Sequence, residues 1–182
     1  MTPRDRLRDL FRERALQFGD FTLVSGKKSS YYVNSKKVLL HAEAITLLGE
    51  LLYEATRDLD YQAMGGLEVG AIPMAAAALT AFHRNGRSIE GFFVRKKPKE
   101  HGSKELIEGE VNAGDRVVVI DDVLTTGGSV VQAIQAIEAR GATVVRVICI
   151  CDRLQGAAEL LAKYDYKPLF TIRDFGIEPP TS

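Results

Sequence analysis

The segment VVVIDDVLTTGGS, residues 117–129, joins an apolar run to two adjacent acids and a polar, glycine-rich stretch. The apolar run predicts a buried strand, which places Asp121 and Asp122 at its carboxyl end. The stretch from Thr125 to Ser129 offers backbone N–H groups, hydroxyl donors and the positive end of a following helix. Carboxylates beside a phosphate-accepting loop suit a sugar phosphate, because acids bind its hydroxyl groups and the loop binds its phosphate.

The same segment has a plainer interpretation as a helix cap after a tight turn. Against this interpretation, two neighbouring carboxylates repel each other and favour a nearby ligand or cation. The loop lacks the Gly-Lys-Ser/Thr ending of a Walker A motif, and it is not a GxGxxG fingerprint. A nucleoside triphosphate or a dinucleotide is therefore disfavoured as the ligand, while the cap and the sugar-phosphate site both remain open.

Cations gather in a second stretch, VRKKPKEHG, residues 94–102. Its basic side chains are Arg95, Lys96, Lys97, Lys99 and His101. Such a charge run is often only a solvated loop. Here it follows the expected strand GFFV at the edge of a crevice, and the polar run continues to Gly109. A mobile cationic loop in that place could close over a leaving anion and stabilise its charge.

Two further stretches follow expected strands. GGLEVGAIP, residues 65–73, is either another anion-accepting loop or a simple connection. Asp152 and Arg153 follow the strand VVRVICIC, where the arginine could hold a planar carboxylate or carbonyl, or form a salt bridge with its neighbour. Cys149 and Cys151 lie in this apolar strand and are expected to pack in the core of a protein from a reducing compartment.

The periodicity along the chain indicates the elements that must position these residues. Strands are expected at 61–66, 88–96, 116–122, 142–152 and 167–172, with helices at 72–84, 128–140 and 156–164. This alternation predicts an α/β fold with a mostly parallel sheet covered on both faces, which binds ligands at the carboxyl ends of its strands. A helix at 4–17, two short strands within 21–34 and a helix at 41–58 precede it. The N-terminal piece does not fit the alternation, and we expect it to fold over one edge of the sheet.

The bulk composition excludes several classes of protein. A chain of 182 residues, 46% hydrophobic and 26% charged, suits one globular domain. Its zero net charge argues against a nucleic-acid or membrane-surface binder. The charged start MTPRDRLRDLFRER is not a signal peptide, and no apolar run approaches the ~20 residues of a membrane span. We therefore expect a cytoplasmic protein. We also expect no metal-ligand cluster, since the three histidines are far apart in the sequence.

Together these stretches resemble the type I phosphoribosyltransferases, whose signature for phosphoribosyl pyrophosphate looks like VVVIDDVLTTGGS. RKKPKEHG, the downstream DR and the upstream FTLVSGKKSSYYVN resemble the orotate phosphoribosyltransferases in particular. The resemblance implies a type I phosphoribosyltransferase-like fold in a single domain, 1–182, with a helix and hood at 1–40 and a mobile catalytic loop at 95–110. The implied reaction joins orotate to phosphoribosyl pyrophosphate and yields orotidine 5'-phosphate and pyrophosphate, a step of pyrimidine synthesis.

The resemblance also implies residue roles. Asp121 and Asp122 would contact the ribose hydroxyls, and Thr125 and Arg153 would contact orotate. Backbone groups around Tyr32 and Val33 would cover its ring. The catalytic residues would be Lys99, His101, Asp121 and Asp122. The full set of implied substrate-binding residues is Tyr32, Val33, Arg95, Lys96, Lys99, His101, Asp121, Asp122, Val123, Leu124, Thr125, Thr126, Gly127, Gly128, Ser129 and Arg153.

The implied cofactor is Mg²⁺, bound mainly through phosphoribosyl pyrophosphate and without a direct protein ligand. The implied assembly is a homodimer in which the loop of Lys99 and His101 meets the pyrophosphate partly across the interface.

Two positions depart from the family pattern. Val24 stands where many members have a lysine, and Val69 with Gly70 replaces a Tyr-Lys pair. Two alternatives stay open, a purine phosphoribosyltransferase and a regulator that binds phosphoribosyl pyrophosphate as a signal.

Overall fold

The computed structural model describes residues 1–22, 28–98 and 105–179, without the side chains of Thr22 and Lys28. Its centre is a six-stranded sheet with the strand order β5-β4-β3-β6-β7-β8. Pairing is parallel throughout except between β4 and β5, so the mostly parallel α/β sheet is confirmed. Its strands are β3 (Ala63–Leu67), β4 (Glu90–Val94), β5 (Ile107–Gly109), β6 (Arg116–Leu124), β7 (Thr143–Asp152) and β8 (Tyr166–Thr171).

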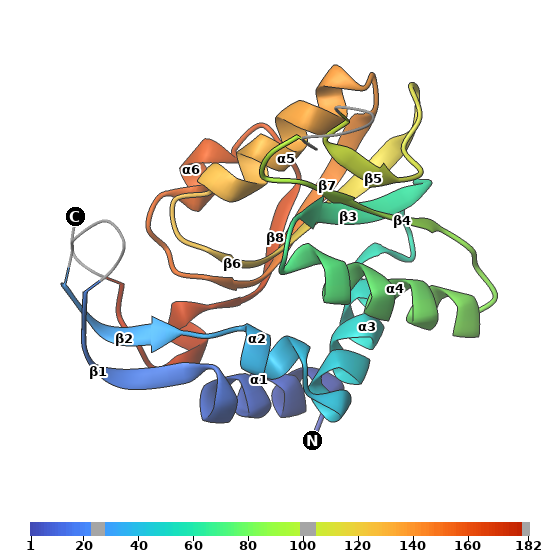
Figure 1. Cartoon of the computed structure of the whole chain (residues 1–182). Coiled ribbons are helices and arrows are strands. Elements are labelled where there is room, and N and C mark those ends of the chain that lie inside the picture. The colour runs from blue at the N-terminus through green and yellow to red at the C-terminus, as the bar shows by residue number, and fades with distance from the viewer. Residues whose placement is uncertain (23–27, 99–104, 180–182) are drawn as a thin grey trace.

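Helices cover both faces of this sheet, as Figure 1 shows. The helices α3 (Ala42–Thr56) and α4 (Ala71–Arg84) lie on one face, and α5 (Gly128–Ala139) and α6 (Ala157–Leu160) lie on the other. Alternate residues of the central strands supply the two cores. Ile120 and Ile148 belong to the cluster under α3 and α4, whereas Val119 and Val147 belong to the cluster under α5. Burial on both faces explains the continuous apolar runs of β6 and β7.

The N-terminal segment forms α1 (Pro3–Arg14), a separate antiparallel hairpin of β1 (Leu16–Thr22) and β2 (Lys28–Val33), and the short α2 (Lys36–Leu39). Its expected place over a sheet edge is only partly right. Arg4 does reach the edge strand β8, since its Nη2 donates to the carbonyl oxygen of Leu169 at 2.8 Å. However, Leu7, Leu10 and Phe11 are buried in the same cluster as α3 and α4, so α1 also covers one face.

Several expected boundaries were wrong. The first helix ends at Arg14 and not at 17, because the chain from Leu16 pairs with β2 as a strand. The expected loop 95–110 is shorter at its end, since Ile107–Gly109 pairs with β4 as β5. The helix expected at 156–164 is only Ala157–Leu160. A short 3-10 helix, η1 (Ile172–Phe175), follows β8 and packs Phe175 against Phe11, with ring centroids 5.0 Å apart.

Candidate active site

The acidic pair lies within the last residues of β6, and the strand continues beyond it to Leu124. The Asp121 side chain is buried, and both of its carboxylate oxygens accept hydrogen bonds. The hydroxyl of Ser129 donates to Oδ2 at 2.7 Å, and the backbone N–H of Asp122 donates to Oδ1 at 2.9 Å. Ser129 thereby links the start of α5 to the acidic pair.

Asp122 contacts the N-terminal segment, which sequence reasoning did not foresee. The hydroxyl of Ser35 donates to its Oδ2, and the ammonium of Lys36 lies 3.4 Å from the same oxygen. The backbone N–H of Val123 donates to Oδ1 at 3.0 Å. Ser35 and Lys36 come directly after the hood stretch YYVN, so their position in the sequence was the available signal for their role.

The two acids have opposite pKa shifts. Burial, reinforced by the charge of Asp122, raises the pKa of Asp121 to about 7. Burial would also raise the pKa of Asp122. The hydrogen bond from Ser35 and the charge of Lys36 outweigh that effect and hold the pKa of Asp122 below its ordinary value. Around neutral pH, Asp122 is therefore the constantly charged member of the pair.

A glycine-containing turn at 125–129, here called the cradle, follows β6 at the start of α5. Gly127 caps the helix with a left-handed φ of 86°, a conformation that favours glycine. The first intrahelical bond runs from the N–H of Val131 to the carbonyl oxygen of Gly127, so the N–H groups of the preceding turn have no acceptor within the helix. A Cβ added at Gly128 would meet nothing within 4 Å. The segment therefore offers an anion the backbone donors and helix dipole that its sequence predicted.

The loop between β3 and α4 lies against Asp122. A Cβ built on Gly70 would be 2.6 Å from Cγ of Asp122, so a side chain at this position would displace the Asp122 carboxylate. The peptide bond between Glu68 and Val69 is cis. Val69 in this loop is 62% exposed.

The first part of the cationic stretch is held in place through the backbone of Lys96. The carboxylate of Glu68 accepts a hydrogen bond from the N–H of Lys96 at 2.8 Å, and the side-chain amide of Gln132 donates to its carbonyl oxygen at 3.1 Å. Glu68 belongs to the β3–α4 loop and Gln132 to α5. The two side chains therefore tie the β3–α4 loop and α5 to one residue of the cationic stretch. Sequence reasoning missed both of them, and neither residue type carries a motif signal.

Arg153 lies immediately after β7, and its side chain contacts the β1–β2 hairpin, here called the hood hairpin. Its Nε donates to the hydroxyl of Tyr31 at 3.2 Å, and its Cζ lies 4.7 Å from the centroid of the Tyr31 ring. The neighbouring Asp152 accepts hydrogen bonds from the N–H of Leu154 at 2.7 Å and the hydroxyl of Tyr166 at 2.8 Å. The alternative of a salt bridge between Asp152 and Arg153 therefore has no support in this arrangement.

Comparison with known proteins identifies this arrangement. The model of the phosphoribosyl transferase domain family matches residues 36–179. An orotate phosphoribosyltransferase of Bradyrhizobium sp. (strain ORS 278) is 44% identical over 178 residues, covering 94% of this chain and 96% of that protein. The chain belongs to the orotate phosphoribosyltransferase family.

Solved structures place the fold in the same family. The crystal structure of Mycobacterium tuberculosis H37Rv orotate phosphoribosyltransferase in complex with 5-phospho-alpha-D-ribosyl 1-diphosphate is 37% identical, with a TM-score of 0.82 over 97% of this chain and 100% of that chain. An adenine phosphoribosyltransferase from Thermoanaerobacter pseudethanolicus is 19% identical, with a TM-score of 0.65 over 90% of this chain and 99% of that chain. The latter likeness shows a shared fold alone.

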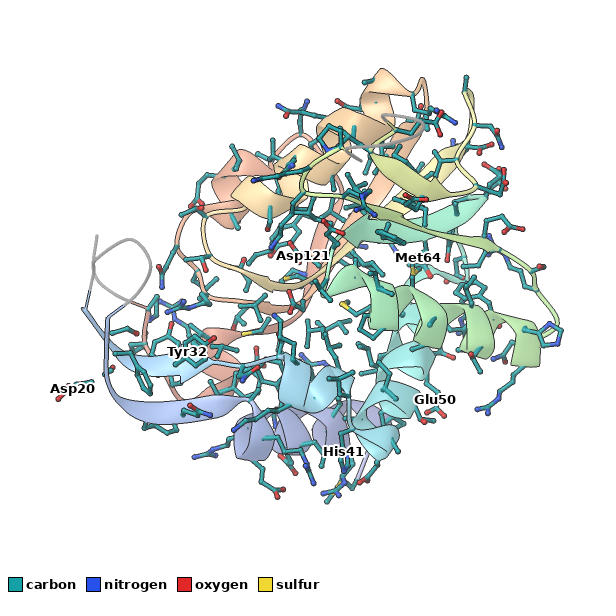
Figure 2. All side chains as sticks on the ribbon, in the orientation of Figure 1. Asp20, Tyr32, His41, Glu50, Met64 and Asp121 are labelled. Atoms are coloured by element: carbon teal, nitrogen blue, oxygen red, sulfur yellow. The ribbon has the colours of Figure 1, made fainter. Side chains whose placement is uncertain are left out.

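The structure of this orotate phosphoribosyltransferase family member brings most of the expected site residues to one edge of the sheet. Residues 121–124 are the last residues of β6 and residues 125–129 follow it, while Arg153 follows β7 and Arg95 and Lys96 follow β4. Tyr32 and Val33 belong to β2 of the β1–β2 hairpin, and Figure 2 labels Tyr32 there. The Tyr32 ring centroid lies 5.8 Å from that of Phe21. Lys99, His101 and Val24 lie outside the described residues.

The donor set fits a metal that arrives with its substrate. In the part of the chain that the structure describes, no group of three or more His, Cys, Asp or Glu could hold a metal ion. All four carboxylate oxygens of Asp121 and Asp122 already accept hydrogen bonds from the protein. Mg²⁺ prefers several water and phosphate oxygens and one or two carboxylates. The acidic pair therefore matches a role beside a phosphate-borne ion better than a protein-built metal cage.

Proposed function

We propose that this chain transfers the 5-phosphoribosyl group from phosphoribosyl pyrophosphate to orotate, giving orotidine 5'-phosphate and pyrophosphate. The observation that carries the proposal is that the acidic pair, the cradle at 125–129 and the guanidinium of Arg153 share one carboxyl edge of the sheet. This edge offers separate groups for a ribose, a phosphate and a planar acid. The family membership supports the same assignment.

In the proposed reaction, the bond from C1 of the ribose to the pyrophosphate oxygen breaks, and the pyrophosphate leaves with the bonding electrons. A ring nitrogen of orotate bonds to C1 and loses its proton. Asp121 and Asp122 hold the ribose hydroxyls, while the hydroxyls and N–H groups of 125–129 hold the 5-phosphate. Arg95, Lys96, Lys99 and His101 offset the charge that builds on the leaving group. Thr125 and Arg153 orient orotate, with backbone groups around Tyr32 and Val33 covering its ring.

Mg²⁺ is the proposed cofactor, held mainly by oxygens of phosphoribosyl pyrophosphate and reached by Asp121 or Asp122 through water. When bound, it neutralises charge on the pyrophosphate.

We also propose a homodimer in which the loop of Lys99 and His101 serves the partner's site. Mixing a Lys99→Ala variant with an Arg153→Ala variant, each inactive alone, should then restore activity, and no recovery would argue against a shared loop.

The chain is proposed to work in the cytoplasm, where its free thiols at Cys149 and Cys151 remain reduced. No helix among the described residues is long and apolar enough to cross a membrane. Neither a membrane nor a nucleic acid enters the proposed reaction, and the zero net charge favours an enzyme over a nucleic-acid-binding regulator.

The decisive experiment offers orotate, adenine and hypoxanthine side by side, each with phosphoribosyl pyrophosphate and Mg²⁺, and omits one component at a time. Consumption of orotate alone, dependent on the other two components, is the expected result. Consumption of a purine alone would overturn the substrate assignment in favour of a purine phosphoribosyltransferase. Binding of phosphoribosyl pyrophosphate without turnover of any base would favour the regulator.

A Lys99→Ala variant tests the role of the cationic stretch. Turnover should fall far more than affinity for phosphoribosyl pyrophosphate, because a cation that meets the leaving group acts mostly in the transition state. Steady-state kinetics with isothermal titration of phosphoribosyl pyrophosphate separates the two quantities. Equal losses in turnover and affinity would contradict a transition-state role.

A further inference from the structure

Tyr31 and Arg153 form a buried polar pair that joins the hood hairpin to the central sheet. Only 3% of Tyr31 and 7% of Arg153 is exposed. The pair has two contacts, the hydrogen bond from Nε to the tyrosine hydroxyl at 3.2 Å and the stacking of the guanidinium on the ring, with Cζ 4.7 Å from the centroid. The two contacts together restrict both the position and the tilt of the guanidinium plane.

The charge of Arg153 has no carboxylate partner among the described residues. The adjacent Asp152 has its oxygens engaged by the N–H of Leu154 and the hydroxyl of Tyr166. A buried guanidinium is costly unless it is paired and hydrogen-bonded. The ring of Tyr31 offsets part of this cost through a cation–π contact, and an anionic ligand would offset the remainder.

A guanidinium can hold a carboxylate by two edges. One edge presents Nε with one Nη, and the other presents both Nη groups. In Arg153 the Nε–H is already donated to Tyr31, so the first edge is engaged. Within the described residues, neither Nη of Arg153 donates a hydrogen bond to the protein. The edge that carries both Nη groups is therefore the edge available for a planar acid.

We propose that Tyr31 is a positioning residue that presents the paired Nη edge of Arg153 to the carboxylate-bearing pyrimidine. This inference rests on the proposed function, because it takes orotate as the planar acid. Tyr31 acts through Arg153, and its hydroxyl sets which edge meets the ligand. Selectivity for an acidic base over a neutral one follows, since a neutral base would leave the buried charge of Arg153 unpaired.

The test uses two substitutions at Tyr31 and one matched control. Tyr31→Phe keeps the ring and removes the hydroxyl, and Tyr31→Leu removes both contacts. Tyr164→Phe removes a hydrogen-bonded hydroxyl elsewhere, since Tyr164 donates to Glu138 at 2.8 Å. Tyr31→Phe should raise the KM for orotate roughly tenfold and leave the KM for phosphoribosyl pyrophosphate nearly unchanged. Tyr31→Leu should raise the orotate KM further, and Tyr164→Phe should change neither constant.

A double-mutant cycle with Arg153→Lys shows whether Tyr31 acts through the arginine. If it does, Tyr31→Phe should have little effect on the orotate KM once Lys replaces the guanidinium, because lysine lacks the planar fork. Additive effects, an unchanged orotate KM in both Tyr31 variants, or equal increases in both substrate constants would each overturn the proposal.

The same cycle measured by thermal unfolding needs no substrate, so failure of the pair can be distinguished from failure of the proposed function. Coupling in unfolding without orotate turnover by the wild-type chain would overturn the orotate assignment and leave the Tyr31–Arg153 contact supported. Turnover of orotate without coupling in either measurement would overturn the positioning role alone.

Discussion

The hydroxyl of Ser35 donates a hydrogen bond to the carboxylate of Asp122, which joins the N-terminal segment to the carboxyl end of β6. Lys36 lies 3.4 Å from the same carboxylate oxygen. These two contacts keep Asp122 ionised, whereas burial and the charge of Asp122 raise the pKa of its neighbour Asp121. The N-terminal segment thereby gives two adjacent carboxyl groups different pKa values.

Replacing Ser35 should alter the pH dependence of the reaction. Ser35→Ala removes the hydrogen bond that lowers the pKa of Asp122, so this pKa should rise. The acid limb of the profile of kcat/KM for phosphoribosyl pyrophosphate should then move to higher pH. Lys36→Met should move this acid limb in the same direction. Ser88→Ala, at an exposed position before β4, is the matched control. An acid limb that stays in place in both variants would contradict this role for Ser35 and Lys36.

Replacing Asp121 should change the pH dependence of stability. The pKa of Asp121 is raised from 3.8 to about 7 in the folded protein, so the folded state holds a proton that the unfolded state releases. The stability from this group is present below the unfolded pKa and is lost as pH rises through the folded pKa. The Asp121→Asn variant cannot ionise at this position, so it does not lose this stability as the pH rises.

The Tm of the Asp121→Asn variant relative to wild type should therefore rise between pH 5 and pH 8, by at least about 2–4 °C, which corresponds to about 1 kcal/mol. Differential scanning calorimetry across that range measures the difference. Asp58→Asn, at an exposed carboxylate, should show no such trend. A Tm difference between Asp121→Asn and wild type that is constant with pH would show that Asp121 is ionised throughout. Activity of Asp121→Asn should fall, since the proposed contact of Asp121 with the ribose is altered.

The sequence predicted those parts of the site that lie within single segments. The acids of β6, the cradle at 125–129 and the arginine after β7 are local patterns, and their meeting follows from the shared carboxyl edge of a parallel sheet. Tyr31, Glu68 and Gln132 could not be found in this way, and the only signal for Ser35 was its place directly after YYVN. Their roles depend on contacts between distant segments, and their residue types are common in ordinary surfaces and cores.

The errors in the fold have a similar cause. Residues 15–17 continue the helical pattern of α1, but strand pairing between Leu16 and Val33 outweighs local propensity. Ile107–Gly109 lies in a polar run, and only its antiparallel pairing with β4 makes it a strand. Central strands were predicted well because burial on both faces leaves a continuous apolar run in the sequence.

Gly70 should not accept a side chain. The Cβ of Gly70→Ala would lie 2.6 Å from Cγ and 2.7 Å from Oδ1 of Asp122, so the carboxylate must move away from its contacts with Ser35 and Val123. We expect kcat/KM to fall by about tenfold or more, since small displacements of a positioned group are costly, with little change in Tm. Thr80→Ala, at an exposed position of α4, the helix that follows Gly70, is the control. Full activity in Gly70→Ala would mean that the position of Asp122 is not critical.

Gln132 should affect the binding of phosphoribosyl pyrophosphate through the backbone of Lys96. Its amide donates to the Lys96 carbonyl oxygen at 3.1 Å, and Glu68 accepts from the Lys96 N–H at 2.8 Å, so both polar groups of this residue's main chain are held by side chains. Because the contact is with the backbone, no substitution of Lys96 tests it. Gln132→Leu keeps a similar volume and removes the donor.

The expected result for Gln132→Leu is an increase of about three- to tenfold in the KM for phosphoribosyl pyrophosphate, the range of one neutral hydrogen bond, with the KM for orotate nearly unchanged. Gln135→Leu makes the same chemical change at an exposed position of α5 and should leave both constants near wild type. Glu68→Gln should resemble Gln132→Leu in direction, since a neutral amide oxygen accepts the Lys96 N–H less strongly than a carboxylate. If Gln132→Leu and Gln135→Leu behave alike, the bond to Lys96 contributes nothing to substrate binding, and the cationic stretch is positioned by its other contacts.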